Sequence, residues 1–379
     1  MNLSDLAADD NPALRRALTA RIEAEGSISF ADFMRTVLYD PQHGYYRVCD
    51  PTLDYESSSN VHPVFGAALG RQLADFWRLL DRPSRFDAFE AGAGSCRLAA
   101  DILRYVERAE PDFYNALHYV VQDVSLVGPN AAAVVERAGL PPDKVEVAAE
   151  LPSSPEIEGC ILSNELLDAL PFLRVRRRDG QLLEVRVGLE GNGFVDVEAP
   201  APAAVEAYFE ALGLAPGEGC DAEVNLEAPR WLERAAGALR HGYLLTLDYG
   251  YEAPALYAPW RRAGTLLTFY RHTSSNDPYA RLGRQDITAS VDLTTAQRTG
   301  EAAGLRTHGL VAQTEFLTAL GISEALAQQP AAGEIEAYYA LRRAVMTLTD
   351  AAGLGRIRVL IQGRDTPDTP PRGLSGDII

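Results

Sequence analysis

Lysine is almost absent from this chain of 379 residues, in which Lys144 is the only example. A nucleotide-binding P-loop needs a lysine in its glycine-rich turn, and Lys144 has no such setting, so the sequence excludes that class of site. A Schiff-base enzyme is also disfavoured, because it needs a lysine nucleophile. The formal net charge of −18 argues against a nucleic-acid-binding surface, which would require a basic stripe.

Cysteines and long apolar runs are scarce as well. The four cysteines form no CxxC pair and have no histidines at metal-binding spacing, so we expect free thiols and no metal site. No run of about 18 apolar residues occurs, and the first residues include acids in place of an apolar signal segment. We therefore expect a soluble, cytoplasmic protein without membrane contact, and 47% apolar composition allows a large core.

Short apolar runs alternate with helical patterns from about residue 85 onward. Five runs end in an acid or a small polar residue: RFDAFEAG, LHYVVQDV, KVEVAAE, GCILSNE and GYLLTLDYG. Amphipathic segments such as CRLAADILRYVERA lie between them. This alternation predicts an α/β fold with a doubly wound, mostly parallel sheet. The apolar tail at 355–365 is suited to a terminal antiparallel strand.

Two regions do not show this alternation of strands and helices. Residues 1–80 have mostly helical periodicity, which predicts a helical N-terminal cap. Residues 172–200 alternate apolar and polar side chains around DG and GNG turns, which predicts an inserted antiparallel meander. We expect a cap at 1–80, a core at 81–170 and 241–379, and an inserted meander and helical subdomain at 171–240.

A glycine-containing turn follows the first predicted strand in FEAGAGSCRLA, with Glu90, Gly92 and Gly94. Glycines allow the backbone to approach a ligand closely, and Asp123 at the end of the next strand could accept both hydroxyls of a ribose. An acid before the turn would repel a pyrophosphate, and Cys96 occupies the third glycine position, so S-adenosylmethionine fits better than NAD. An NAD-dependent oxidoreductase remains an alternative, and a ligand-free turn with a helix-capping acid is the ordinary explanation.

The stretch ILSNELLDALP ends an apolar run on polar side chains. Asn164 and Glu165 would stand at the carboxyl edge of the sheet, and in a helical turn Asp168 would share a face with Glu165. Two carboxylates there could hold a guanidinium in a bidentate fork and accept its proton. LTLDYG places Asp248 and Tyr249 at the same edge. A helix cap with a solvated acid, or a plain strand-end turn, would also explain these residues. The polar stretch 264–300 is expected to be a lid or loop over this edge.

Several longer motifs occur together in one order. They are ISFADFMRTVLYDPQHGYY, HPVFGAALG, FEAGAGSCRLAADIL, SNELLDALP, LTLDYG, GTLLTFYRHTSSNDPYARLGRQDITASVD, QTEFLTALGI and GRIRVLIQG. On these motifs the chain resembles the MidA-like methyltransferases, the family of the mitochondrial complex I assembly factor with arginine methyltransferase activity. The resemblance implies a class I Rossmann-like methyltransferase fold, S-adenosyl-L-methionine as methyl donor, and an arginine of a protein as acceptor.

The resemblance also implies roles for single residues. The cofactor would contact Glu90, Gly92, Gly94, Asp123 and Asn164, and the acceptor would contact Tyr39, Tyr45, Tyr46, Tyr249 and His272. A loop hydrogen-bond anchor is the ordinary alternative for the histidine. We expect Glu165, Asp168 and Asp248 to be catalytic, because they stand at or just after strand ends where an acceptor would be held.

The chain departs from the family pattern at positions that concern the acceptor. Ser57–Asn60 replaces the usual TSPE, and Ser290 replaces a usual histidine. These changes leave open a methyltransferase that acts on a small molecule or a biosynthetic peptide, with N- or O-methyl transfer. A non-catalytic assembly factor that keeps the fold is a further alternative. The inserted hairpin is suited to mediate a homodimer.

Overall fold

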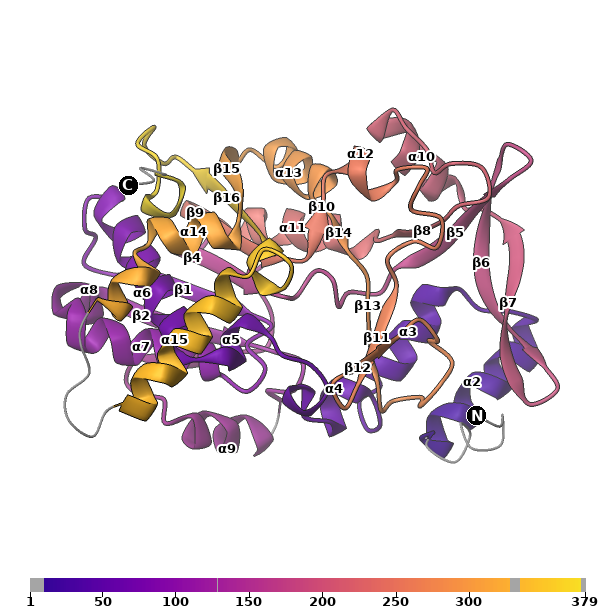
Figure 1. Ribbon diagram of the computed structural model, residues 1–379, viewed down its shortest axis with the longest axis horizontal. Coiled ribbons are helices and arrows are strands. Elements are labelled where there is room, and N and C mark those ends of the chain that lie inside the picture. The colour runs from indigo at the N-terminus through magenta and orange to yellow at the C-terminus, as the bar shows by residue number, and fades with distance from the viewer. Residues whose placement is uncertain (1–9, 128, 328–334, 376–379) are drawn as a thin grey trace. The chain divides into compact units, whose positions relative to one another are not determined.

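The computed structural model describes residues 10–127, 129–327 and 335–375, and its chain divides into two compact units (Figure 1). The parallel-sheet unit comprises Glu56–Leu166, Trp231–Tyr249 and Gln297–Ile379. The meander unit comprises Met1–Tyr55, Leu167–Arg230 and Gly250–Ala296. The first boundary, at Glu56, falls inside the region 1–80 for which the sequence predicts a helical cap.

Seven strands form the sheet of the parallel-sheet unit, in the order β15-β16-β9-β4-β1-β2-β3. They are β1 (Phe86–Ala91), β2 (Leu117–Gln122), β3 (Val145–Ala148), β4 (Ile157–Asn164), β9 (Leu239–Asp248), β15 (Arg306–Ala312) and β16 (Arg358–Arg364). The first five pair in parallel, whereas β16 is antiparallel to both β9 and β15. The predicted α/β fold with a mostly parallel sheet is confirmed.

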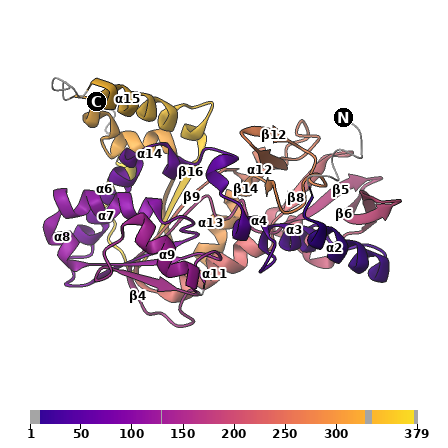
Figure 2. The same cartoon turned by 90° about the horizontal axis from the view of Figure 1, so that it is seen from below.

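Helices cover both sides of this sheet. They are α5 (Ser58–Val61), α6 (Pro63–Leu79), α7 (Arg97–Ala109), α8 (Pro111–Ala116), α9 (Pro129–Ala138), α11 (Glu227–Ala238), α13 (Leu293–Ala302), α14 (Gln313–Ala319) and α15 (Ile335–Thr349), with short 3-10 helices η2 (Ile322–Leu326), η3 (Leu354–Arg356) and η4 (Arg372–Leu374). Side chains of α6, α7, α14 and α15 share one core with β1, β2, β4, β9 and β16. Figure 2 shows α11 and α13 on the opposite side of β9 and β16 from α14 and α15, as in a doubly wound fold.

The chain reverses its direction of winding at strand β1. Strands β2 and β3 follow on one side of β1, whereas β4 and β9 follow on the other. Because these strands are parallel, their carboxyl ends, at Ala91, Gln122, Asn164 and Asp248, share one edge of the sheet. Ligands of open α/β sheets bind at such a reversal, so this edge is the first place to look for a site.

The tail strand β16 is antiparallel, as predicted, but it does not lie at the edge of the sheet. It is hydrogen-bonded between β9 and β15, and β15 forms the edge. Its central residues Val359–Gly363 are all buried. A near-continuous apolar run is the expected pattern for a strand covered on both faces.

The meander unit contains the predicted antiparallel insertion. Its four-stranded sheet has the order β7-β6-β5-β8, formed by β5 (Leu173–Arg178), β6 (Gln181–Glu190), β7 (Gly193–Pro200) and β8 (Asp221–Val224). All its neighbouring strands are antiparallel, and turns at Gly180 and Gly191, both with positive φ, connect β5, β6 and β7. The prediction of a meander at 172–200 is confirmed.

The stretch 264–300, predicted as a lid or loop, contains secondary structure. Strands β11 (Leu267–Tyr270), β12 (Thr273–Ser275) and β13 (Asp286–Thr288) form an antiparallel sheet in the order β12-β11-β13. Strand β14 (Val291–Asp292) pairs in parallel with β10 (Gly250–Tyr251), and helix α13 follows. The expectation of a loop without secondary structure is therefore wrong, because backbone pairing orders segments whose side chains are mostly polar, and the role as a lid stays a prediction.

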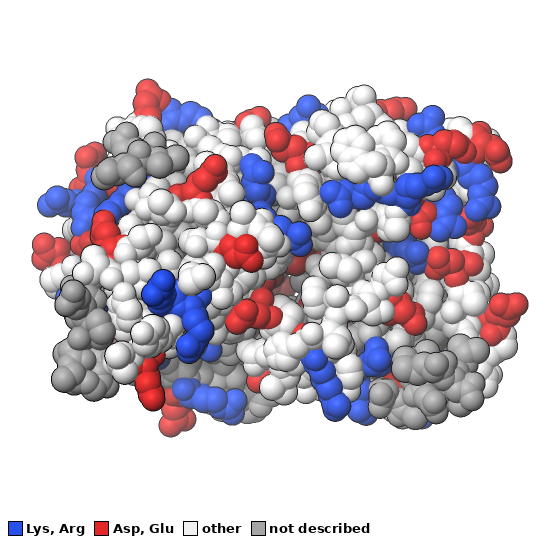
Figure 3. All heavy atoms as spheres, viewed as in Figure 1, with Lys and Arg blue, Asp and Glu red and all other residues white. Residues whose placement is uncertain are grey.

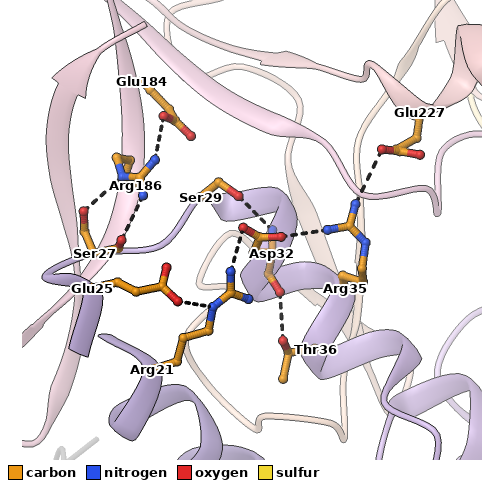
Figure 4. Close-up of polar contacts among 10 residues, drawn as sticks. All are labelled: Arg21, Glu25, Ser27, Ser29, Asp32, Arg35, Thr36, Glu184, Arg186 and Glu227. Atoms are coloured by element: carbon orange, nitrogen blue, oxygen red, sulfur yellow. Dashed lines mark hydrogen bonds and ion pairs between the residues drawn. The ribbon is translucent and has the colours of Figure 1, made fainter. Parts of the chain in front are cut away.

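The remaining helices of the meander unit are α2 (Pro12–Glu25), α3 (Phe30–Tyr39), α4 (Tyr45–Val48), α10 (Ala203–Leu212) and α12 (Ala253–Leu256), with the 3-10 helix η1 (Pro51–Leu53). Ser29 caps α3 by accepting a hydrogen bond from the Asp32 amide. Figure 4 shows the Asp32 carboxylate between Arg21 and Arg35, and Arg35 in turn pairs with Glu227. Ion pairs near the surface contribute little to stability, about 0–1 kcal/mol each. The side chains of Phe30 and Phe33 on the same helix are fully buried and pack in the hydrophobic core of the unit.

Candidate active site

The glycine turn after β1 has the geometry of a ligand cradle. Gly92 and Gly94 have φ values of +74° and +49°, which residues other than glycine adopt only with strain. A Cβ atom on Gly94 would meet nothing within 4 Å among the described residues, whereas one on Gly92 would lie 3.0 Å from the Leu166 side chain. The turn thus leaves open space beside Gly94, whereas at Gly92 the neighbouring Leu166 side chain leaves little room for a larger residue.

Asp123 joins this turn to the end of β2. Its Oδ2 atom accepts a hydrogen bond from the Gly94 amide at 3.0 Å. Its Oδ1 atom accepts from the Ser125 amide at 2.7 Å and from the Ser125 hydroxyl at 2.6 Å. The Oδ1 atom already accepts two hydrogen bonds, whereas Oδ2 accepts one and keeps a second lone pair. The anchoring therefore leaves acceptor capacity on Oδ2 for a ribose hydroxyl, which the sequence predicts there.

Glu90, the last acid of β1, is only 3% exposed. The Tyr119 hydroxyl donates a hydrogen bond of 2.6 Å to its Oε2 atom. Burial raises the pKa of Glu90 to about 8, and the hydrogen bond from Tyr119 opposes part of that rise. The carboxyl group is therefore protonated near neutral pH unless positive charge comes close to it.

The end of β4 turns sharply at Glu165, where φ is +52°. The Glu165 amide donates to the Leu247 carbonyl at 2.8 Å. Its Oε1 atom accepts hydrogen bonds from the Ser58 amide at 3.0 Å and from Asn164 Nδ2 at 3.1 Å. The Oδ1 atom of Asn164 is buried and has no hydrogen-bond partner in the described part of the chain, so it can accept a bond from a ligand.

Asp248 ends strand β9 and is fully buried, with 0% exposure. Its Oδ2 atom accepts from the Leu166 amide at 3.2 Å, and its Oδ1 atom accepts from the Tyr249 amide at 2.8 Å. The Tyr249 ring faces the Arg356 guanidinium at 5.9 Å. Backbone N–H donors thus hold the carboxylates of both Glu165 and Asp248 at the carboxyl ends of neighbouring strands.

Asp168 belongs to the other unit. The segment after β4 is a bend and a turn with no helix, because the positive φ of Glu165 is incompatible with a helical turn. The predicted sharing of one helix face by Glu165 and Asp168 is therefore wrong. Asp168 is buried, and its Oδ2 atom accepts a hydrogen bond of 2.9 Å from the Thr288 hydroxyl.

The N-terminal tyrosines of the meander unit bond to protein groups. Tyr39 donates to the Ala169 carbonyl at 2.8 Å, Tyr45 donates to Asp54 at 2.8 Å, and Tyr46 donates to Asp286 at 2.7 Å. Burial raises the pKa of both Tyr45 and Tyr46 well above the usual range. Their predicted contact with the acceptor stays a prediction.

Asp54 and Asp286 are two buried acids of the meander unit that sequence reasoning did not single out. Burial raises the pKa of Asp286 to about 7, while the Tyr46 hydroxyl opposes part of that rise. Asp54 accepts from the Arg271 amide at 2.8 Å, and its carbonyl accepts from the His272 amide at 2.9 Å. His272 is exposed, and this hydrogen bond comes from its backbone, so both the loop anchor and the role in acceptor binding stay predictions for its side chain.

Eight of the predicted residues belong to the parallel-sheet unit: Glu90, Gly92, Gly94, Asp123, Asn164, Glu165, Asp248 and Tyr249. Sequence reasoning missed Tyr119, which hydrogen-bonds Glu90. Tyr119 stands in the predicted strand β2, directly beside Ala88 of β1, so strand pairing could have suggested it. Ser58 belongs to the segment Ser57–Asn60, but it is 107 positions away from Glu165, and its hydrogen bond to Glu165 was not predicted.

The structure shows the hydrogen bonds and the backbone conformation of the residues that depart from the family pattern. The Ser290 amide donates to the Thr265 hydroxyl at 3.0 Å, and Thr265 in turn donates to the buried Glu223. Ser57 and Ser59 share a hydrogen bond of 3.0 Å between their hydroxyls. Cys96 has a φ of +60° at the position where the usual glycine would adopt this conformation freely, and burial raises the pKa of its thiol to about 12.

A parallel sheet with a glycine turn after β1, acids at the ends of β1 and β2, and a switch point at β1 defines a class I methyltransferase fold. The residues fit S-adenosylmethionine: Gly94 leaves open space, Asp123 retains acceptor capacity, and Asn164 presents a buried unpaired oxygen among the described residues. All four cysteines are unpaired thiols, as predicted. No described helix is long and apolar enough to cross a membrane.

Comparison with known proteins identifies the family. A family model described as "Putative S-adenosyl-L-methionine-dependent methyltransferase" matches residues 68–311, and the chain belongs to this family. The protein arginine methyltransferase NDUFAF7 homolog of Drosophila melanogaster is 28% identical over 93% of this chain and 85% of its own length. Human NDUFAF7, also described as a mitochondrial protein arginine methyltransferase, is 26% identical over 83% of this chain and 75% of its own length.

A solved structure from Burkholderia thailandensis resembles almost the whole chain. It is described as a COG1565 superfamily member and likely methyl transferase bound to S-adenosyl-homocysteine. The two chains are 28% identical, the TM-score is 0.86, and the match covers 99% of this chain and 97% of the other. The predicted MidA-like family, its fold and its cofactor S-adenosyl-L-methionine are thereby confirmed.

Proposed function

We propose that this S-adenosylmethionine-dependent methyltransferase transfers a methyl group to an arginine of a protein partner. The observation that carries the proposal is the pair of carboxylates, Glu165 and Asp248, that main-chain N–H groups hold at the carboxyl ends of β4 and β9. A guanidinium is the side chain that matches fixed carboxylates best, because it presents several N–H donors in a planar fork. The relatives described as protein arginine methyltransferases support the same acceptor.

When bound, S-adenosylmethionine supplies an electrophilic methyl carbon on a sulfonium sulfur and leaves as a neutral thioether. The chain's own residues then have two tasks. Glu165 and Asp248 orient the acceptor so that a nitrogen lone pair faces the methyl carbon, which contributes through alignment. One of these carboxylates accepts the proton that the acceptor nitrogen loses when its new C–N bond forms.

The test uses tritiated donor and lysate protein as the acceptor pool. Glu165→Gln is expected to lower methyl transfer by at least about 100-fold, in the range that general bases contribute. Its dissociation constant for S-adenosylhomocysteine should stay within a few-fold of the parent's. Asp168→Asn, at the third predicted catalytic acid, is expected to lose transfer in the same assay. Full activity of both variants would contradict the assignment of roles.

A matched control is available on the same strand. Glu158 lies near the amino end of β4 and pairs with Arg240 in solvent, so Glu158→Gln should keep full activity. Amino-acid analysis of the labelled protein band should recover methylarginine. Label found only in small extractable material, or in a peptide product without methylarginine, would instead support the small-molecule or peptide alternative. Binding of S-adenosylhomocysteine without any transfer would support the non-catalytic one.

A further inference from the structure

We propose that Gln313 and Ser58 are positioning residues for Glu165, linked to it by two hydrogen bonds that Ser58 donates, one to Gln313 and one to Glu165. The inference rests on the proposed function, since it assigns to Glu165 a role in holding the acceptor. It concerns the first residue of the sequence motif QTEFLTALGI, whose apolar residues Phe316, Leu317 and Leu320 belong to the core. All three residues lie within the parallel-sheet unit.

Gln313 is the fixed end of this chain of bonds. It is the first residue of α14, and its side chain is 0% exposed. Its Nε2 atom donates to the Leu348 carbonyl at 3.0 Å and to the Leu354 carbonyl at 3.1 Å. Two carbonyl acceptors define which end of the amide is nitrogen, so its Oε1 atom faces the other way. That oxygen accepts the hydrogen bond from Ser58.

Ser58 connects Gln313 to Glu165. It is 0% exposed, and its hydroxyl donates to Gln313 Oε1 at 3.0 Å. Its backbone amide donates to Glu165 Oε1 at 3.0 Å. Helix α5 has four residues, too few to hold its own conformation, so the hydroxyl bond to Gln313 fixes where the amide points.

Glu165 needs such external support. Its backbone has a left-handed φ of +52°, a conformation that is strained for a residue other than glycine. The Ser58 amide and Asn164 Nδ2 both donate to the same oxygen, Oε1, and so fix the orientation of the carboxylate plane. A shift of the Ser58 amide would therefore reorient the carboxylate that is proposed to hold the acceptor.

Thr314 provides a matched control for a purely structural role. Its hydroxyl donates to the Thr349 carbonyl at 3.0 Å and to the Gly355 carbonyl at 3.1 Å, next to the two carbonyls that Gln313 holds. Thr314→Val thus removes two similar hydrogen bonds between the start of α14 and the segments around Thr349 and Gly355. It leaves Ser58 and its bond to Gln313 intact. Gln313→Met keeps the side-chain length and removes the whole connection.

The first measurement needs no activity. In full-length protein labelled with ¹⁵N-serine, the Ser58 amide signal is identified by its loss in Ser58→Ala. Its chemical shift should change in Glu165→Gln, which alters the acceptor of its hydrogen bond. We expect Gln313→Met to move the signal upfield and Thr314→Val to leave it unchanged. An unaltered Ser58 signal in Gln313→Met would overturn the proposal.

The second measurement is the rate of tritiated methyl transfer to lysate protein at saturating donor. Gln313→Met and Ser58→Ala should each lose about 10–100-fold, as expected for a misplaced group, with unchanged affinity for S-adenosylhomocysteine. Thr314→Val should keep the parental rate. An equal loss in Gln313→Met and Thr314→Val, or a full rate in Ser58→Ala, would overturn the positioning role. If Glu165→Gln is itself fully active, the proposed function fails, while the amide signal still decides whether Gln313 holds Glu165.

Discussion

Cys96 shows how a single residue departs from its family at a local cost. Its φ of +60° lies in the left-handed region, where glycine is free of strain and other residues are not. Elsewhere, exchanging alanine for glycine usually lowers stability by about 0.5–1 kcal/mol. At this position we predict the opposite order: Cys96→Gly should be at least as stable as Cys96→Ala, because only glycine relieves the strain.

Urea unfolding of both variants checks this order. Both substitutions remove the same buried thiol. The difference between the free energies of unfolding of the two variants therefore reports mainly the conformational preference of the backbone at this position. Affinity for S-adenosylhomocysteine should be retained in Cys96→Gly, which restores the usual third glycine. A Cys96→Gly variant less stable than Cys96→Ala by the ordinary amount would show that the left-handed strain is negligible here.

Glu90 predicts a pH dependence of stability. Its pKa is about 8 in the folded state, above the ordinary value of 4.5, because burial disfavours the charged form. Between these two values the folded chain binds more protons than the unfolded chain, so the free energy of unfolding falls as pH rises. The stability that comes from the extra proton on Glu90 is fully present below about pH 4.5 and is lost as the pH rises through about 8.

The variant Glu90→Gln keeps a neutral side chain of the same shape and should flatten this dependence. With about 1.4 kcal/mol for each pKa unit, the contribution amounts to a few kcal/mol at most. Urea unfolding at several pH values between 5 and 8 measures it, with Glu301→Gln as a control. Glu301 is exposed and its pKa is lowered by hydrogen bonds from Gln297 and Thr307, so its small effect has the opposite sign. Parallel pH curves for parent and Glu90→Gln would contradict the assignment.

At the scale of elements, the packing of α6 on α7 depends on glycine. A Cβ atom on Gly66 would lie 2.5 Å from Asp101 Cβ, which is too close for any side chain. We predict that Gly66→Ala destabilises the protein by about 1–3 kcal/mol, the usual range for overpacking. Gly237 in α11 is the matched control, since a Cβ there meets nothing within 4 Å in the described chain. Gly237→Ala should raise stability by about 0.5–1 kcal/mol. Unfolding in urea should give effects of opposite sign, and equal signs would refute the packing argument.

Regular strands and helices were predictable because their side chains have a clear period. The runs in β1 and β4 are apolar and end in acids, and the meander alternates with period two. Strands β12 and β13 were not predictable, because three-residue segments in the polar stretch 264–300 carry no period. The turn at Glu165 was misjudged for a related reason: only the folded chain forces a residue other than glycine into positive φ.

Residues of the candidate site were predictable where they end parallel strands. Glu90, Asn164 and Asp248 could be placed at one sheet edge from the order of the strands alone. The bonds that orient them could not. Ser58 and Gln313 are 255 positions apart, and the segments that contain them do not show that the two side chains are hydrogen-bonded. Such partners become visible only when the fold brings distant segments together.

At the scale of the whole molecule, charge is strongly acidic but locally paired. The arginines of β5 illustrate the pairing: Arg174 binds Asp196, and Arg176 binds Glu198 and Asp221. Figure 3 shows, on the viewed face, basic side chains with acidic ones beside them. The arginines of β5 (residues 174–178, RVRRR) are therefore neutralised by neighbouring acids. The formal net charge of −18 determines the long-range electrostatic field of the protein.

This field should attract a cationic acceptor, and salt should weaken that attraction. The Debye length falls from about 30 Å at about 0.01 M salt to about 8 Å at about 0.15 M, so distant acids stop contributing. We predict that kcat/KM for an arginine peptide with basic flanking residues falls several-fold over this range, while kcat changes little. A peptide with the same arginine and acidic flanking residues is the control, and its kcat/KM should rise or stay level. Equal salt dependence of both peptides would show that the acceptor meets only local charges, and that the acidity of the chain has no part in recognition.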